Sequence, residues 1–180
     1  MGMLEVRRHS DRKTTGGSQL SQEGVDRARR VGASMGPFAK VTTSVVPRAR
    51  ETAIAMGFAV DHEVVTLSSD PDLYDDAAKL PWWADDEPFV GLSKALSVDG
   101  PYRDYAHSMA AIWRDLLTPL GRDEAALFVG HSGELEAALV ACFPNADYSS
   151  WGHQFGPCEG ARLEFSGEPQ CWRGVEFLRN

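Results

Sequence analysis

The stretch Val6-Arg7-Arg8-His9-Ser10-Asp11-Arg12 places one histidine among three arginines, directly after a short apolar run. An arginine guanidinium matches the oxygens of a phosphate, often with two hydrogen bonds at once. A neutral imidazole can attack phosphorus and carry the phosphoryl group covalently. Neighbouring cations lower the pKa of an imidazole and so keep it unprotonated. The stretch therefore predicts either a phosphate site with a histidine nucleophile or a basic strand end that merely contains a histidine.

The overall composition is that of one globular domain with a sizeable core. The chain has 180 residues, of which 43% are hydrophobic and 24% are charged. Its formal net charge of -8 argues against non-specific binding to nucleic acid, which needs a basic face. In such an acidic chain the arginines around His9 form a local positive island that can attract anionic ligands.

The expected lack of targeting signals and the cysteine usage both favour a cytoplasmic protein. The sequence has no apolar run of about 18 residues, so no membrane span is expected. Charge begins at Glu5, which leaves no room for the apolar core of a signal peptide. The odd number of cysteines (Cys142, Cys158 and Cys171) and their spacing indicate neither a disulfide framework nor a zinc site.

Predicted strands and helices alternate along most of the chain. Strands are expected at residues 3–6, 40–45, 63–67 and 125–129, and helices after Ser21 and at 47–56, 102–117 and 134–142. Residues 68–101, rich in proline and aspartate, are expected to form short helical pieces and loops across one end of the sheet. The tryptophan pair 82–83 within them is expected to pack under this segment, with a lid over an aromatic or extended substrate as the alternative. Residues 161–165 and 174–178 alternate like strands of a hairpin. This order predicts an α/β fold with a largely parallel sheet.

Three polar motifs each directly follow a predicted strand. They are Arg8-His9, the segment from Ser44 to Ala53, and Gly130-His131-Ser132. Ligands of parallel sheets bind beyond the carboxyl ends of the strands, so all three motifs are expected at one edge. The helices that follow the second and third motifs would direct their positive N-terminal ends toward a bound anion. The sequence thus predicts two histidines and at least two arginines around one phosphate.

The ordered set of motifs resembles the histidine phosphatase superfamily, which includes the cofactor-dependent phosphoglycerate mutases, small phosphatases and phosphohistidine phosphatases. The family's Arg-His-Gly is Arg8-His9-Ser10 here. Its Ser-Pro-x-x-Arg-Ala-x-x-Thr-Ala stretch matches residues 44–53 with Val45 in place of the proline, and its second histidine matches residues 128–131. The resemblance covers most of the chain and implies one three-layer α/β domain over residues 1–180. Its mostly parallel central sheet would carry helices on both faces, with an irregular insertion or lid at about 68–101.

The resemblance also implies roles for the residues of the three motifs. His9 is the expected nucleophile, and Arg8, Arg48 and His131 are expected to hold the phosphoryl group and to stabilise charge in the transition state. Phosphoryl transfer depends mostly on positioning and charge, so neither a metal nor a cofactor is expected. The acid-phosphatase branch has Arg-His-Gly-x-Arg, which offers Arg12 as a further phosphate ligand. The alternative for Arg12 is a loop arginine that faces solvent.

Ser10 and Arg7 flank Arg8-His9, and each has its own expected place relative to the site. Ser10 replaces the family's glycine and brings a hydroxyl that either donates to the phosphate or is only tolerated there. Arg7 is expected on the opposite face of the strand from Arg8, outside the site.

The proton donor for the leaving oxygen is the least defined part of the predicted site. In the mutase-like branch a glutamate follows the second-arginine motif, and Leu73-Tyr74-Asp75 resembles its context. Asp75 is therefore the first candidate, with Asp70, Asp72 and Asp76 as rivals. Glu134, three residues after the second histidine, is the alternative acid. Its other interpretation is a helix-start acid favoured by the helix dipole.

These features predict a phosphatase that hydrolyses a phosphomonoester or a phosphoramidate, protein phosphohistidine included, through a phosphohistidine on His9. Its size resembles that of the small phosphohistidine phosphatases. Its partners would be a phosphorylated small molecule or a phosphoprotein, and neither nucleic acid nor membrane. A non-catalytic module that binds a phosphorylated partner or ligand is the alternative. Mutase activity is less expected, because the chain has little room for segments that close over the site.

Overall fold

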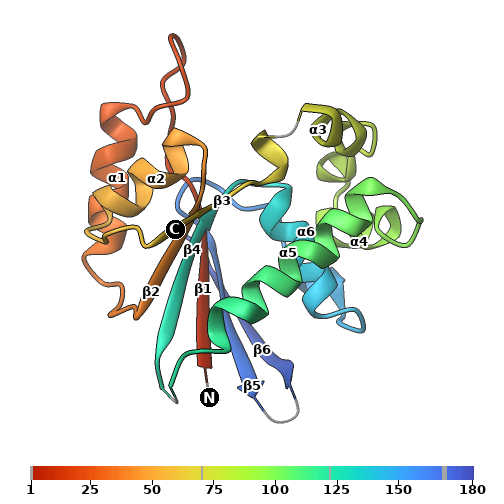
Figure 1. Ribbon diagram of the computed structural model, residues 1–180. Coiled ribbons are helices and arrows are strands. Elements are labelled where there is room, and N and C mark those ends of the chain that lie inside the picture. The colour runs from red at the N-terminus through yellow and green to blue at the C-terminus, as the bar shows by residue number, and fades with distance from the viewer. Residues whose placement is uncertain (1, 70, 122, 168–169) are drawn as a thin grey trace.

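A six-stranded mixed sheet forms the centre of the computed structural model, which describes residues 2–69, 71–121, 123–167 and 170–180 (Figure 1). The strand order is β3-β2-β4-β1-β5-β6. Strand β1 pairs in parallel with β4, and β2 in parallel with both β3 and β4, whereas β5 is antiparallel to β1 and to β6. The bounds are β1 Gly2–Arg8, β2 Lys40–Ser44, β3 His62–Val64, β4 Ala125–Gly130, β5 Gly160–Gly167 and β6 Gln170–Leu178.

Helices cover both faces of this sheet (Figure 1). The helices are α1 Gln22–Gly32, α2 Pro47–Ala55, α3 Pro71–Ala78, α4 Pro88–Ala95, α5 Pro101–Leu117 and α6 Glu134–Cys142. On β4, Leu127 and Val129 pack with α2, whereas Phe128 packs on the opposite face with residues of α5 and α6. This alternation buries both faces of the strand. The predicted three-layer, mostly parallel α/β fold is confirmed. None of the described helices is both long and apolar enough to cross a membrane.

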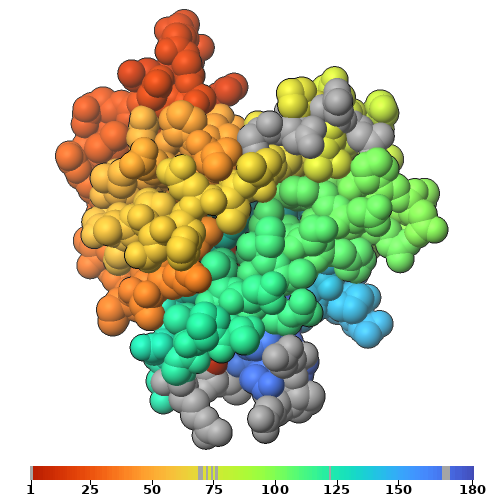
Figure 2. All heavy atoms as spheres, viewed as in Figure 1, coloured from red at the N-terminus to blue at the C-terminus, as the bar shows by residue number. Residues whose placement is uncertain are grey.

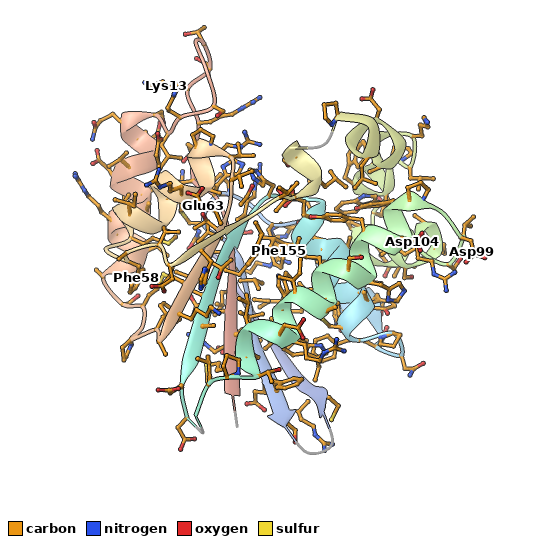
Figure 3. All side chains as sticks on the ribbon, in the orientation of Figure 1. Lys13, Phe58, Glu63, Asp99, Asp104 and Phe155 are labelled. Carbon is orange, nitrogen blue, oxygen red and sulfur yellow. The ribbon has the colours of Figure 1, made fainter. Side chains whose placement is uncertain are left out.

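The start of α1 is fastened to the loop that follows β1. The Ser21 side chain accepts a hydrogen bond from the Gly24 amide, which confirms Ser21 as the N-cap. A Cβ atom on Gly24 would lie 2.1 Å from the carbonyl oxygen of Asp11, so only glycine allows this approach. The loop between Asp11 and Ser21 projects from the molecule, with Lys13 on it (Figure 3).

The segment between β3 and α5 consists of short helical pieces, as predicted. They are η1 Leu67–Ser69, α3, η2 Trp82–Ala84 and α4, and a further short helix, η3 Tyr148–Trp151, follows α6. In Figure 1 α3 and α4 lie beside α5 and α6, near the upper end of the sheet. Strand β3 is shorter than predicted and ends at Val64, because the chain turns from this edge strand into η1 within three residues. Trp82 is buried and Trp83 is 42% exposed.

Arg7 belongs to a buried ion pair and points away from Arg8. Its guanidinium contacts the Glu5 carboxylate at 2.8 Å and donates to the carbonyl oxygen of Cys158. Arg162 contacts the same carboxylate at 3.0 Å. Glu5 and Arg7 are both buried, so each charge depends on its partner. Arg7 therefore stabilises the fold. Its side chain points away from Arg8, as the sequence predicts.

Replacing Arg7 by methionine should lower the free energy of unfolding by about 2–3 kcal/mol, because the buried Glu5 carboxylate keeps only Arg162. Urea denaturation followed by circular dichroism measures this loss. Arg29→Met, at a guanidinium that is 66% exposed, is the matched control and should stay within about 0.5 kcal/mol. Equal stability of the two variants would contradict the structural role given to Arg7.

Candidate active site

His9 lies directly beyond the end of β1 and is held by backbone groups on both sides. Its amide donates to the carbonyl oxygen of Gly130 at 2.9 Å, which ties it to the end of β4. Its ring Nδ1 lies 2.6 Å from the carbonyl oxygen of Ser10. A carbonyl can only accept, so Nδ1 carries the proton and Nε2 keeps its lone pair. That lone pair accepts a hydrogen bond from Nε of Arg48 at 3.0 Å.

Arg48 is placed by the first turn of α2, which Pro47 begins. The Thr52 hydroxyl donates to the Arg48 carbonyl oxygen at 2.7 Å and accepts from the Ser10 amide at 3.0 Å. One buried threonine thus couples the helix that carries Arg48 to the residue that follows His9.

Arg8 enters the site from the opposite side of the sheet from α2. One of its terminal nitrogens donates to the carbonyl oxygen of Phe155. Phe155 lies on the side covered by α5 and α6 (Figure 3). The Nε atom of Arg8 is buried and has no hydrogen-bond partner within the described part of the chain.

His131 follows β4 and is the second histidine of the site. The ring centroids of His9 and His131 are 5.0 Å apart, with 61° between the planes. Both ring nitrogens of His131 are buried, and neither finds a partner among the residues that the structure describes. Buried polar atoms are rarely left unpaired in folded proteins, so this ring indicates the place of a ligand.

Burial and the two arginines keep both histidines neutral. Burial lowers the pKa of His9 to about 4, with further lowering from Arg48, Arg8 and Arg12 and opposition from the Ser10 carbonyl. Burial, Arg48, His9 and Arg8 lower the pKa of His131 to about 2. The charges of Arg8 and Arg48 act on both rings, so the four motif residues form one cluster. At neutral pH this cluster presents two cations and an unprotonated His9.

Glu134, the first residue of α6, is fully buried beside this cluster. One carboxyl oxygen accepts from the Ser68 amide at 2.7 Å, and the other, Oε2, has no partner among the described residues. Burial raises the pKa of this carboxyl to about 7, although hydrogen bonds from Ser68 and Thr66 and the charge of Arg48 oppose the shift. A carboxyl with this pKa is protonated often enough at neutral pH to donate a proton.

Helix capping in α6 is performed by a different glutamate, Glu136. Its side chain accepts from the Gly133 amide at 2.6 Å, from the Ser132 hydroxyl at 3.0 Å and from the Phe155 amide at 2.8 Å. Glu136 thus supplies the half of a capping box in which the third helical residue accepts from the N-cap amide, since Gly133 has no side chain to supply the other half. The spacing of N-cap and third helical residue could have shown this from the sequence. With the cap satisfied by Glu136, Glu134 is left for another role.

Asp75 lies apart from this cluster. It is on α3, and its side chain is exposed. Asp75 is not among the residues that line the cavity next to Arg8. Asp70 and the side chains of Asp72 and Asp76 lie outside the part of the chain that the structure describes. Among the candidate acids that the structure does describe, only Glu134 is placed beside the histidines.

Arg12 and Ser10 occupy the edge of the site. Arg12 is exposed, pairs with Leu20 in an isolated β-bridge and lowers the pKa of His9 through its charge. It lines a second cavity, with residues 11–15 and 21–23, rather than the one next to Arg8. The Ser10 hydroxyl is buried and faces the Cys158 thiol.

A cavity of about 300 Å³ adjoins the cluster at Arg8. The indentation between the projecting 12–20 loop and α3 is visible at the top of Figure 2. Sequence patterns do not associate most of the lining residues with the site, because the described ones come from seven separate stretches of the chain. The described lining comprises Arg8, Leu67, Ala77, Ala78, Trp82, Trp83, Tyr102, Ser132, Gly133 and Gln154.

Solved phosphatase structures share this fold over the whole chain. The phosphoserine phosphatase of Entamoeba histolytica, solved with 3-phosphoglyceric acid, superposes with a TM-score of 0.68 at 15% identity, covering 100% of this chain and 98% of its own. A mycobacterial glucosyl-3-phosphoglycerate phosphatase superposes with a TM-score of 0.65 at 17% identity, covering 98% of both chains. No family model and no curated protein sequence matches the chain. At these identities the likeness establishes the fold.

The buried Glu134 carboxyl should make stability depend on pH. Its folded pKa lies above the unfolded value, so its contribution is present at low pH and is lost as pH rises through about 7. Glu134→Gln removes this titration. The variant should therefore gain up to about 3 kcal/mol relative to the parent between pH 4.5 and pH 8.

Urea denaturation of both proteins across this pH range measures the difference. Glu23→Gln, at an exposed carboxylate on α1, is the matched control. A flat difference for Glu134→Gln would show that the carboxyl titrates normally.

Proposed function

We propose that this protein is a histidine phosphatase that hydrolyses small phosphomonoesters through a phosphohistidine on His9. The observation that carries the proposal is the set of unpartnered buried polar atoms around that ring. These atoms are Nε of Arg8, both ring nitrogens of His131 and Oε2 of Glu134. A phosphate group has oxygens that accept from arginine and from a histidine N–H, and its ester oxygen can take a proton from a carboxylic acid.

In the first step Nε2 of His9 attacks phosphorus. The phosphate displaces the Arg48 N–H from the Nε2 lone pair, and Arg48 then donates to a phosphate oxygen. The P–O bond to the leaving group breaks as the P–N bond forms, and Glu134 gives its proton to the departing oxygen. Arg8, Arg48 and His131 stabilise the charge on the transferring group. The proton on Nδ1, held by the Ser10 carbonyl, keeps the attacking nitrogen in the correct tautomer.

In the second step water attacks the phosphohistidine. The Glu134 carboxylate, formed in the first step, takes a proton from the water as its oxygen bonds to phosphorus. The P–N bond breaks and returns the electron pair to Nε2 of His9. Inorganic phosphate leaves, and Glu134 is again protonated. The sum is the hydrolysis of one phosphomonoester by one water molecule.

The proposed substrate class is a small phosphorylated molecule. The solved neighbours are named as phosphatases of phosphoserine and of glucosyl-3-phosphoglycerate, which are small phosphomonoesters. The cavity of about 300 Å³ next to Arg8 is at the lower end of the range of small-molecule sites, about 300–1,000 Å³. A phosphoramidate has the same phosphoryl group and could be attacked in the same way.

His9→Ala should abolish phosphate release, because it removes the Nε2 lone pair that accepts from Arg48 and that the Ser10 carbonyl keeps in the attacking tautomer. Release of phosphate from p-nitrophenyl phosphate and from benzyl phosphate measures the loss. His62→Ala, at an exposed histidine at the start of β3, is the control and should keep the parental rate. Turnover by His9→Ala comparable to that of the parent would refute the nucleophile. Tight binding of phosphate by the parent without any turnover would favour the non-catalytic binding module.

Glu134→Gln should lower kcat on benzyl phosphate by about 10²–10⁴, because its alkoxide must be protonated as it leaves. On p-nitrophenyl phosphate, whose leaving group is stable as an anion, the loss should be much smaller. In the parent, kcat/KM on benzyl phosphate should fall as pH rises through about 7, where Glu134 of the free protein loses its proton. Asp75→Asn is the matched comparison and should leave both rates unchanged. The opposite result, a loss confined to Asp75→Asn, would assign the acid to Asp75.

A further inference from the structure

The described wall of the cavity next to Arg8 is mostly uncharged. Among its described lining residues the only charged side chain is Arg8, which belongs to the phosphate-binding cluster. Leu67, Ala77 and Ala78 are aliphatic, and the remaining side chains are aromatic or neutral polar. A leaving group with its own carboxylate or ammonium would lose water there without gaining an ionic partner from this wall.

One side of the cavity is an aromatic wall that is rigidly connected to the His131 turn. The Tyr102 hydroxyl donates to the carbonyl oxygen of Gly133 at 2.8 Å and also hydrogen bonds with the Trp82 side chain. An indole N–H can only donate, so Trp82 donates to the Tyr102 oxygen. A Cβ atom on Gly133 would lie 4.0 Å from the Trp82 ring, which places this ring beside the turn. The indole is therefore fixed relative to the histidines.

The second indole, Trp83, extends this wall to the surface. Its ring centroid lies 5.9 Å from that of Trp82, with 81° between the planes, and its side chain remains 42% exposed. An exposed tryptophan face that lines a cavity offers a large apolar contact for a ring. Packing alone would bury both rings, yet only Trp82 is buried.

We propose that the leaving group of the substrate is uncharged and aromatic and that it packs against Trp82 and Trp83. This inference rests on the proposed phosphatase function and specifies its substrate class. Serine and glycerate leaving groups carry charges that the described wall does not pair. A sugar is uncharged, but it would bury hydroxyls against Leu67, Ala77 and Ala78.

A comparison of four substrates tests this specificity. Benzyl phosphate, glucose 6-phosphate, phosphoserine and 3-phosphoglycerate all release a primary alcohol, so leaving-group acidity does not separate them strongly. The kcat/KM for benzyl phosphate should exceed that for each of the others at least about tenfold. A value for any of the other three equal to or above that for benzyl phosphate overturns the proposal. No turnover of these four or of p-nitrophenyl phosphate would instead remove the proposed function, and this inference with it.

Trp83→Ala tests the aromatic wall itself. The kcat/KM for benzyl phosphate should fall about three- to tenfold, whereas that for 3-phosphoglycerate should change less than about twofold. Trp83→Phe should restore most of the loss. Leu80→Ala, at a comparably exposed residue of the same segment outside the cavity lining, is the matched control. Equal effects of Trp83→Ala on the two substrates, or no effect on either, would contradict the assignment.

Discussion

The parallel pairing of β1 with β4 is the constraint on which the rest of the site depends. Its register places Arg8 opposite Gly130, so the residue after each strand is a histidine and the two rings lie 5.0 Å apart. The His9 amide continues the ladder by donating to the Gly130 carbonyl. A shift of one residue in this register would turn one histidine to the other face of the sheet. The geometry of the candidate site is thus set by backbone hydrogen bonds.

Around this pair the protein gathers two arginines and a buried carboxyl. Arg8 and Arg48 lie beside two histidines that burial keeps neutral, and the buried Glu134 carboxyl has a raised pKa. Each of these arrangements costs folding stability. A phosphate group would hydrogen bond with the atoms that have no partner among the described residues. The site is therefore organised for a ligand at the expense of stability, as is common where groups act in chemistry.

Much of the fold and the centre of the site could be predicted from the sequence, because both depend on local patterns. Apolar runs followed by Arg8-His9 and Gly130-His131 mark strand ends, and Ser21 and Pro47 mark helix starts. The proton donor could not be chosen in this way, because acidity depends on burial that only the tertiary structure creates. Asp75 and Glu134 look alike in the sequence, yet one is exposed and the other is fully buried. The cavity wall could not be predicted from the sequence either, since it combines residues from distant segments.

The phosphohistidine on His9 is tested most directly by rapid quenching of the protein during turnover of benzyl phosphate. Peptide mapping then follows in alkali, because P–N bonds survive there. A phosphoryl group should appear on the peptide that contains His9 and on no other peptide, and it should form fast enough to precede phosphate release. The Glu134→Gln variant should form this species slowly from benzyl phosphate but rapidly from p-nitrophenyl phosphate. Turnover without a phosphoryl group on His9, or a phosphoryl group on another residue, would contradict the proposed mechanism.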